Sequence, residues 1–398
     1  MINEHYLEML GHKSVIRELA EYAAVRGKEI GEENVFDFSL GNPSVPAPES
    51  FTDAAIRLLQ TEEPVRLHGY SPTLGIPSVK EKIAASLNRR FGMNYTAGHI
   101  FPASGCAGAV AHALRAVTKP GDKVLVQAPF FPEYIPYIND TGAQIEIIPA
   151  RFEDFQINFE ALEQMLQPGV AAILINSPNN PSGVAYTGET LEKLSSLLAA
   201  KSKELGYNLF LISDEPYREI AFGGREIPYP ARFYPHTLTC YSFSKSLSVP
   251  GERIGYVAVC PECEHAEDIV PMCGQISRGI GHNCPSSLIQ LAAAEAVDDT
   301  ADLSVYETNM ELLYETFREL GFEVKKPDGT FYIMPKALEE DAVSFCRKAQ
   351  KYDLIFVPCD AFHAHGYFRV AYCIDTEKVR RSLPVIRRFV KEVYGGNT

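Results

Sequence analysis

The 398-residue sequence has no long hydrophobic run and no excess of basic residues. It contains no stretch of about 18 consecutive apolar residues, so no segment is predicted to span a membrane. Its 37 lysines and arginines are outnumbered by 51 aspartates and glutamates, and the formal net charge of −14 is not typical of a protein that binds nucleic acid. The N-terminus shows no basic segment followed by an apolar core, as a signal peptide would. We therefore expect a cytoplasmic protein without a membrane or nucleic-acid partner.

The cysteines do not form a recognisable framework. There are nine, an odd number, scattered along the chain, which favours reduced thiols over the disulfides of a secreted protein. Cys260 and Cys263 have the spacing of half a zinc site, and His363 and His365 lie close in sequence. No second cysteine pair with matching spacing follows, so we expect ordinary thiols, a plain loop and no metal site.

The middle of the chain alternates short apolar runs with helical patterns. The apolar runs are 123–128, 171–176, 208–213, 237–243 and 254–260, and the helical patterns include 78–90, 105–117 and 190–205. Continuous apolar runs separated by helices predict an α/β domain with a mostly parallel sheet, buried on both faces.

The pattern changes after Pro285. Two long helices are expected at 286–297 and 302–320, and short strands and helices follow, which indicates a smaller α+β domain. We predict an N-terminal arm at 1–48 that contributes to the small domain, and a large cofactor-binding domain at 49–285. A linking helix and the small C-terminal domain would occupy 286–398.

Functional residue types follow four of the apolar runs. Phe131 comes after the first run, Asn180 after the second, Asp214 and Tyr217 after the third, and Lys245 after the fourth. Because ligands of open α/β sheets bind outside the carboxyl ends of the strands, we expect these side chains at one rim.

An aromatic ring, an amide, a carboxylate with a phenol, and a lysine suit pyridoxal 5′-phosphate (PLP), whose ring acts as an electron sink. A buried carboxylate beside the ring nitrogen keeps that nitrogen protonated, and Asp214 is the candidate. Asn180 and Tyr217 would donate to the ring oxygen, and Phe131 would stack on the ring. Lys245 would form a Schiff base with the cofactor and then act as general acid and base.

The phosphate of this cofactor needs its own cradle. Gly105, Cys106 and Ala107 open a predicted helix whose small residues allow backbone N–H groups to approach an anion. Ser242 and Arg253, three residues before and eight residues after the lysine, would complete the cradle.

The order of these motifs resembles the fold-type I PLP-dependent aminotransferases of class I/II, the aspartate-aminotransferase-like group. The matching segments lie between residues 38 and 369 and read GNP (41–43), YSPTLG (70–75), NNPSG (179–183), DEPY (214–217), SFSK (242–245), GERIG (251–255), GTFY (329–332) and GYFRV (366–370). The resemblance implies a large domain with a mostly parallel, seven-stranded type of sheet between helices, plus a smaller α+β domain. Cys106 departs from the usual phosphate loop, and Cys359 and His363 stand where glycines are usual.

The same resemblance implies roles for residues outside the strand ends. Arg369 would bind the substrate α-carboxylate in a bidentate pair, with Asn180 beside it, and the Gly41 backbone would close over it. Tyr70 would reach the phosphate of the neighbouring subunit, so that the active sites are shared in a homodimer. We therefore expect an aminotransferase that moves an amino group from an L-amino acid to a 2-oxo acid by ping-pong chemistry through the Lys245 Schiff base.

Two other functions stay open at this point. A C–S β-lyase on the same scaffold would use the same lysine and the same electron sink. A non-catalytic regulator of this fold would carry an added DNA-binding segment, but only 40 residues precede Gly41. Neither the side-chain specificity nor the amino acceptor follows from the sequence.

Overall fold

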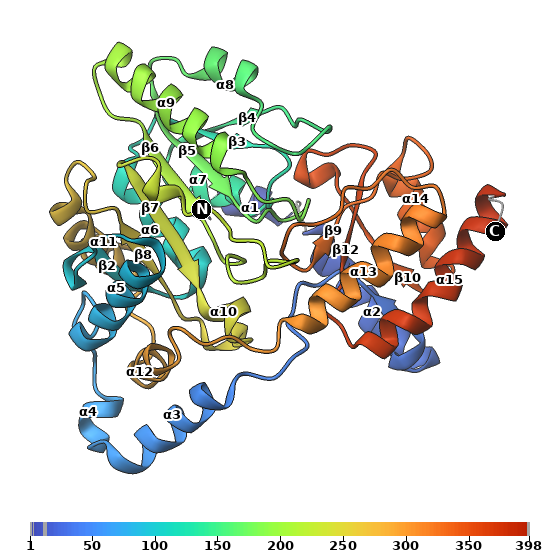
Figure 1. Ribbon diagram of the computed structural model, residues 1–398, viewed down its shortest axis with the longest axis horizontal. Helices are drawn as coiled ribbons and strands as arrows, with labels where there is room; N and C mark the ends of the chain where they lie inside the picture. The colour runs from blue at the N-terminus through green and yellow to red at the C-terminus, as the bar shows by residue number, and fades with distance from the viewer. Residues whose placement is uncertain (1, 3, 11–13, 396–398) are drawn as a thin grey trace.

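The computed structural model describes residues 2, 4–10 and 14–395. It has a larger unit around a central sheet and a smaller unit that contains the last described helix, joined by extended segments (Figure 1). Among the described residues, none of the helices has both the length and the hydropathy needed to cross a membrane.

Seven strands form the central sheet in the order β2-β8-β7-β6-β5-β3-β4. Their bounds are β2 Ile100–Ala103, β3 Lys123–Gln127, β4 Gln144–Ile148, β5 Val170–Asn176, β6 Phe210–Asp214, β7 Thr237–Ser242 and β8 Gly255–Val259. β7, β6, β5, β3 and β4 are parallel, whereas β8 runs antiparallel to its neighbours β7 and β2. The predicted fold class, a mostly parallel sheet of the seven-stranded type, is confirmed.

Two of these strands were not among the predicted apolar runs. β2 is short and contains Pro102, which disfavours a strand except at an edge, and β2 is an edge strand. β4 forms the opposite edge and is only partly buried, so it lacks a continuous apolar run.

Helices cover both faces of this sheet. The helices of the larger unit are α3 Glu49–Thr61, α4 Pro64–His68, α5 Pro77–Phe91, α6 Gly105–Val117, α7 Tyr134–Asn139, α8 Phe159–Met165, α9 Gly188–Leu205, α10 Phe243–Ser246, α11 Ala266–Ile280 and α12 Ser287–Glu295. Successive side chains of β3 point to opposite faces. Val124 and Val126 belong to one core cluster with Ala109 of α6, and Leu125 belongs to another with Leu194 of α9. This two-sided burial explains the continuous apolar runs.

The smaller unit combines residues from both ends of the chain. It contains α2 Val15–Ile30, β1 Phe36–Asp37, α13 Ser304–Glu319, β9 Tyr332–Ile333, α14 Ala342–Gln350, β10 Leu354–Ile355, β11 Val357–Pro358, β12 Phe368–Ala371 and α15 Thr376–Tyr394, and α1 Glu4–Met9 precedes it. β1 pairs in parallel with β10, and β11, β12 and β9 form an antiparallel sheet. The domain boundaries at 48/49 and 285/286 stay predictions.

Candidate active site

The sheet topology brings the predicted site residues to one edge. β7, β6, β5 and β3 are neighbours in the sheet, and the segments that follow them carry the four sets of functional residue types. Because β8 is antiparallel, its first residue, Gly255, pairs both with Ser242 at the end of β7 and with Ala103 at the end of β2. Arg253 and the N-terminus of α6 therefore lie at the same edge.

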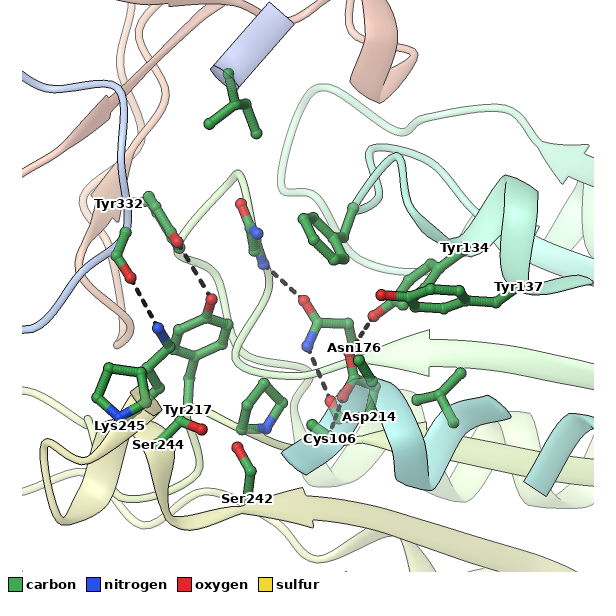
Figure 2. A pocket seen from close by; sticks show the side chains of 18 of the residues that line it. Cys106, Tyr134, Tyr137, Asn176, Asp214, Tyr217, Ser242, Ser244, Lys245 and Tyr332 are labelled. Carbon is green, nitrogen blue, oxygen red and sulfur yellow. Dashed lines mark hydrogen bonds between the residues drawn. The ribbon is translucent and has the colours of Figure 1, made fainter. Parts of the chain in front are cut away.

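Eleven of the thirteen predicted residues line one cavity of about 270 Å³ (Figure 2). They are Gly41, Cys106, Ala107, Phe131, Asn180, Asp214, Tyr217, Ser242, Lys245, Arg253 and Arg369. The volume is close to the lower end of the range for small-molecule sites, about 300 Å³.

Lys245 lies in α10, the single helical turn that follows β7. Its Nζ donates a hydrogen bond to the Gly41 carbonyl oxygen at 2.7 Å and lies 5.2 Å from the centroid of the Phe331 ring. Burial lowers the pKa of this amine to about 8. Near neutral pH a useful fraction is therefore neutral, the form that can attack a carbonyl or accept a proton.

Asp214 ends β6 and is buried against two donors. The Tyr134 hydroxyl donates to Oδ2, and the Cys106 thiol lies 2.6 Å from Oδ1. Burial raises the pKa of this carboxyl to about 6, and the two donors oppose the shift. A carboxylate held in this way can keep a ring nitrogen protonated, and that role of Asp214 stays a prediction.

Arg369 comes from β12 of the smaller unit and is only 1% exposed. Its Nη1 donates to Asn180 Oδ1 at 3.1 Å and its Nη2 donates to the Ser39 carbonyl oxygen at 2.6 Å, while its buried Nε has no partner. The guanidinium also lies over the Tyr332 ring, 4.5 Å from the centroid. Arg369 lines the cavity, and a buried guanidinium there suits a carboxylate ligand.

The N-terminus of α6 and Arg253 lie together at the place where the sequence predicts a phosphate cradle. Gly105 opens the helix with a positive φ of 72°, and a Cβ at this position would lie 2.7 Å from Arg253 Nη2. That nitrogen is 3.3 Å from the Ser104 carbonyl oxygen, so the guanidinium sits beside the free N–H groups of a 13-residue helix. A side chain at Gly105 would collide with this guanidinium, so the glycine allows Arg253 to lie against the start of α6 and brings two sources of positive potential together.

Tyr70 does not line this cavity. Its side chain is fully exposed and borders a separate hollow formed by 67–73 and 283–287. The two residues that depart from the usual glycines also lie outside the cavity lining: Cys359 is buried, and His363 stacks on Phe130 with ring centroids 5.1 Å apart.

Several lining residues were missed by the sequence argument. Tyr134 and Tyr137 lie three and six residues after Phe131, a helical spacing that places them on the same side of α7, and Asn176 ends β5. Tyr332 is in a segment that matched the family, and its hydroxyl lies 3.2 Å from that of Tyr217. The helical spacing could have identified Tyr134 and Tyr137 from the sequence. The Tyr217–Tyr332 contact could not be found in this way, because the two residues are 115 positions apart.

The cavity therefore offers what PLP requires: an amine, a buried carboxylate, an anion cradle and an aromatic side chain. The bound cofactor supplies an electron sink for reactions at the substrate α-carbon.

Comparisons with known proteins agree with this donor set. The profile of the family described as "Aminotransferase class I and II" matches residues 33–386. A crystal structure of an aminotransferase from Eubacterium rectale is 40% identical, covers 99% of both chains and superposes with a TM-score of 0.96. Aspartate aminotransferase from Thermus thermophilus is 25% identical with a TM-score of 0.84, over 95% of this chain and 97% of its own.

A similar relative by sequence is a probable aspartate/prephenate aminotransferase of Aquifex aeolicus, 29% identical over 90% of this chain and 92% of its own. These relatives are all named aminotransferases, which does not favour the C–S lyase alternative. The chain belongs to the class I and II aminotransferase family, and it is an enzyme that uses pyridoxal 5′-phosphate to transfer amino groups between amino acids and 2-oxo acids.

Proposed function

We propose that Lys245 is the residue that holds the cofactor and moves the proton in amino-group transfer from an L-amino acid to a 2-oxo acid. The carrying observation is the buried Lys245 amine with a pKa of about 8, in the same cavity as Asp214 and Arg369. Nζ, once displaced by the incoming amino group, would accept the proton from the substrate α-carbon and return it on the cofactor side.

The other residues bind and orient. Asp214 would hold a proton at the ring nitrogen, and Asn180 and Tyr217 would donate to the ring oxygen. Phe131 would cover one ring face. Gly105, Cys106 and Ala107 would contribute backbone N–H groups to the phosphate, assisted by Ser242 and Arg253. Arg369, with Asn180 and the Gly41 backbone, would position the substrate α-carboxylate.

Transfer without an acceptor should stop after one turnover. The purified enzyme, mixed with an amino acid alone, is expected to form one equivalent of 2-oxo acid per active site and no free ammonia. Addition of a 2-oxo acid should then start continuous turnover, because ping-pong transfer needs the acceptor to regenerate the enzyme. Continuous release of ammonia from the amino acid alone would contradict transfer and support a lyase.

Arg369 and Arg253 offer a matched pair for separating substrate binding from cofactor binding. Arg369→Lys keeps the charge but loses the planar fork, so we expect kcat/KM to fall by about 10- to 100-fold for amino and oxo acids alike, with unchanged cofactor affinity. Arg253→Lys should do the reverse: it should lower the affinity for PLP and leave KM near the wild-type value. Steady-state kinetics and cofactor titration measure both, and the same defect in both variants would refute the assignment.

A homodimer with shared sites is the proposed assembly. Exposed apolar side chains of α3, α4 and α11 support an interface on the side of the molecule that carries Tyr70; they are Ile56, Leu59, Val65, Met272 and Ile280. Tyr70 itself is fully exposed in the single chain and away from its own cavity.

Hybrid dimers test whether Tyr70 acts across the interface. In a hybrid of a Lys245→Ala subunit with a Tyr70→Phe subunit, the site that keeps Lys245 would receive an intact Tyr70 from its partner. That site should bind PLP with wild-type affinity, whereas the Tyr70→Phe homodimer should bind about tenfold more weakly. If the hybrid bound PLP as weakly as the Tyr70→Phe homodimer, Tyr70 would act in its own subunit's site. If sedimentation showed the wild-type protein to be a monomer, the proposed dimer would be disproved.

The cytoplasm is the proposed location. All nine cysteines are unpaired in the structure, as expected for a reducing compartment. Cell fractionation followed by detection of the protein tests this placement.

A further inference from the structure

Cys106 lies in the loop predicted to receive the cofactor phosphate, but its side chain does not point along the cradle. Its Sγ is 2.6 Å from Asp214 Oδ1 and 3.2 Å from the Cys240 carbonyl oxygen, on the side of the cavity where β6 and β7 end. Figure 2 shows the Cys106 side chain next to Asp214 at the start of α6. A thiol so placed can donate its hydrogen to the Asp214 carboxylate.

We propose that Cys106 is a positioning residue for Asp214: its S–H group holds one carboxylate oxygen, the Tyr134 hydroxyl holds the other, and the Cys106 side chain takes no part in phosphate binding. This inference rests on the proposed function, in which Asp214 faces the ring nitrogen of the cofactor.

The protonation states agree with a thiol donor. Burial, followed by the negative charge of Asp214, raises the pKa of Cys106 well above its usual value, so the sulfur keeps its proton at physiological pH. Burial raises the pKa of Asp214, and both donors act in the opposite direction. Loss of the thiol would therefore leave more of the carboxyl protonated in weakly acidic solution.

Within the part of the chain that the structure describes, no basic side chain is among the groups that shift the pKa of Asp214. The titratable groups that interact with it are Cys106 on α6, Tyr134 and Tyr137 on α7, Tyr217 after β6, and Cys240 on β7. Thiols and phenols are neutral near pH 7, so within this group donated hydrogen bonds, and not ion pairs, keep the carboxylate charged.

Cys106 and Val110 provide a matched comparison, because they lie one turn apart on α6 and both line the cavity. Cys106→Ala removes a donor, Cys106→Ser keeps one, and Val110→Ala removes a similar amount of apolar surface without touching the hydrogen bond. Affinity is measured with two probes, PLP and pyridoxal, which share the ring but differ in the phosphate. Each titration is made at about pH 6 and about pH 8.

We expect Cys106→Ala to bind both probes about three- to tenfold more weakly at the lower pH and less than about twofold more weakly at the higher pH. Cys106→Ser should bind like the wild type, and Val110→Ala should show no dependence of its defect on pH. The S–H stretching band in the infrared spectrum provides a readout independent of activity. A component missing from Cys106→Ala should shift in Asp214→Asn, because the acceptor of the thiol hydrogen changes.

Other outcomes would overturn the inference in distinct ways. If Cys106→Ala lost affinity for PLP but not for pyridoxal, and by the same factor at both pH values, its side chain would bind the phosphate. Unchanged affinity of Cys106→Ala for both probes would assign it no role in binding. If the wild-type enzyme bound neither probe, the proposed function itself would fail, and not only the inference about Cys106.

Discussion

Replacement of Lys245 by alanine is expected to abolish steady-state amino-group transfer. The variant loses the amine proposed to hold the cofactor, and among the described residues Lys245 is the only lysine of the cavity lining, so turnover should fall by about 10⁴-fold. PLP should still bind, because the groups proposed for its phosphate and ring nitrogen are untouched. Initial rates with saturating substrates, together with an absorption titration of the cofactor, measure the two effects separately.

The matched control is Lys245→Arg. It preserves a positive charge in the cavity, but a guanidinium does not give up its proton at any working pH. If Lys245 served only as a charge, the arginine variant would retain most of the activity. We expect it to be as inactive as Lys245→Ala, and full turnover by the alanine variant would disprove the role given to Lys245.

Replacement of Asp214 by asparagine should damage activity while making the cofactor-free protein more stable. The amide cannot hold a proton at the ring nitrogen, and loss of one such preorganised electrostatic partner costs about 10²- to 10³-fold in turnover. Cofactor affinity should fall in parallel.

The stability effect has the opposite sign because of burial. Burial raises the pKa of Asp214 from its ordinary value of 3.8 to about 6, so the folded protein binds this proton more tightly than the unfolded chain does. The contribution of Asp214 to the free energy of unfolding is therefore most favourable below about pH 4 and is lost as the pH rises through about 6. A shift of about 2 pKa units corresponds to ~3 kcal/mol at pH 8. The asparagine variant avoids this cost, but its amide oxygen can accept from only one of the two donors, so we expect a net gain of ~1–2 kcal/mol.

Urea unfolding of the two cofactor-free proteins at about pH 8 and about pH 4 measures this difference. The free energy of unfolding of Asp214→Asn should exceed that of the wild type at the higher pH, and the advantage should disappear at the lower one. A variant less stable than the wild type at the higher pH would mean that the two donors outweigh the burial of the charge.

Much of the larger unit could be predicted because its signals are local. Helix α6 begins and ends where the small-residue pattern of 105–117 placed it, and five of the seven central strands overlap predicted apolar runs. The edge strands β2 and β4 were missed because a proline in β2 and the partial exposure of β4 weaken the apolar signal. One further rule, that the carboxyl ends of parallel strands lie at the same edge of a sheet, was enough to predict that the residues after these strands lie together. They are Phe131, Asn180, Asp214 and Lys245.

The contacts within the site were harder to predict because they join distant parts of the chain. Arg369 meets Asn180 across 189 positions, and Lys245 meets Gly41 across 204. No periodicity encodes such pairs; they depend on how β1 and β12 of the smaller unit are held beside the rim of the larger sheet. Sequence resemblance placed Arg369, Asn180 and Gly41 around the substrate carboxylate, but it did not indicate that Lys245 donates to the Gly41 carbonyl oxygen.

The sequence by itself determined the fold class, the order of the motifs and the residue types available at the strand ends, since hydrophobic period and turn chemistry act over a few residues. Only the tertiary structure decided the direction of each side chain and its electrostatic environment. Cys106 shows the difference: its position at the start of α6 was readable, but its contact with Asp214 exists because β2, β8, β7 and β6 are adjacent in the sheet. The pKa values of Lys245 and Asp214 likewise follow from burial, which is a property of the assembled core and not of the local sequence.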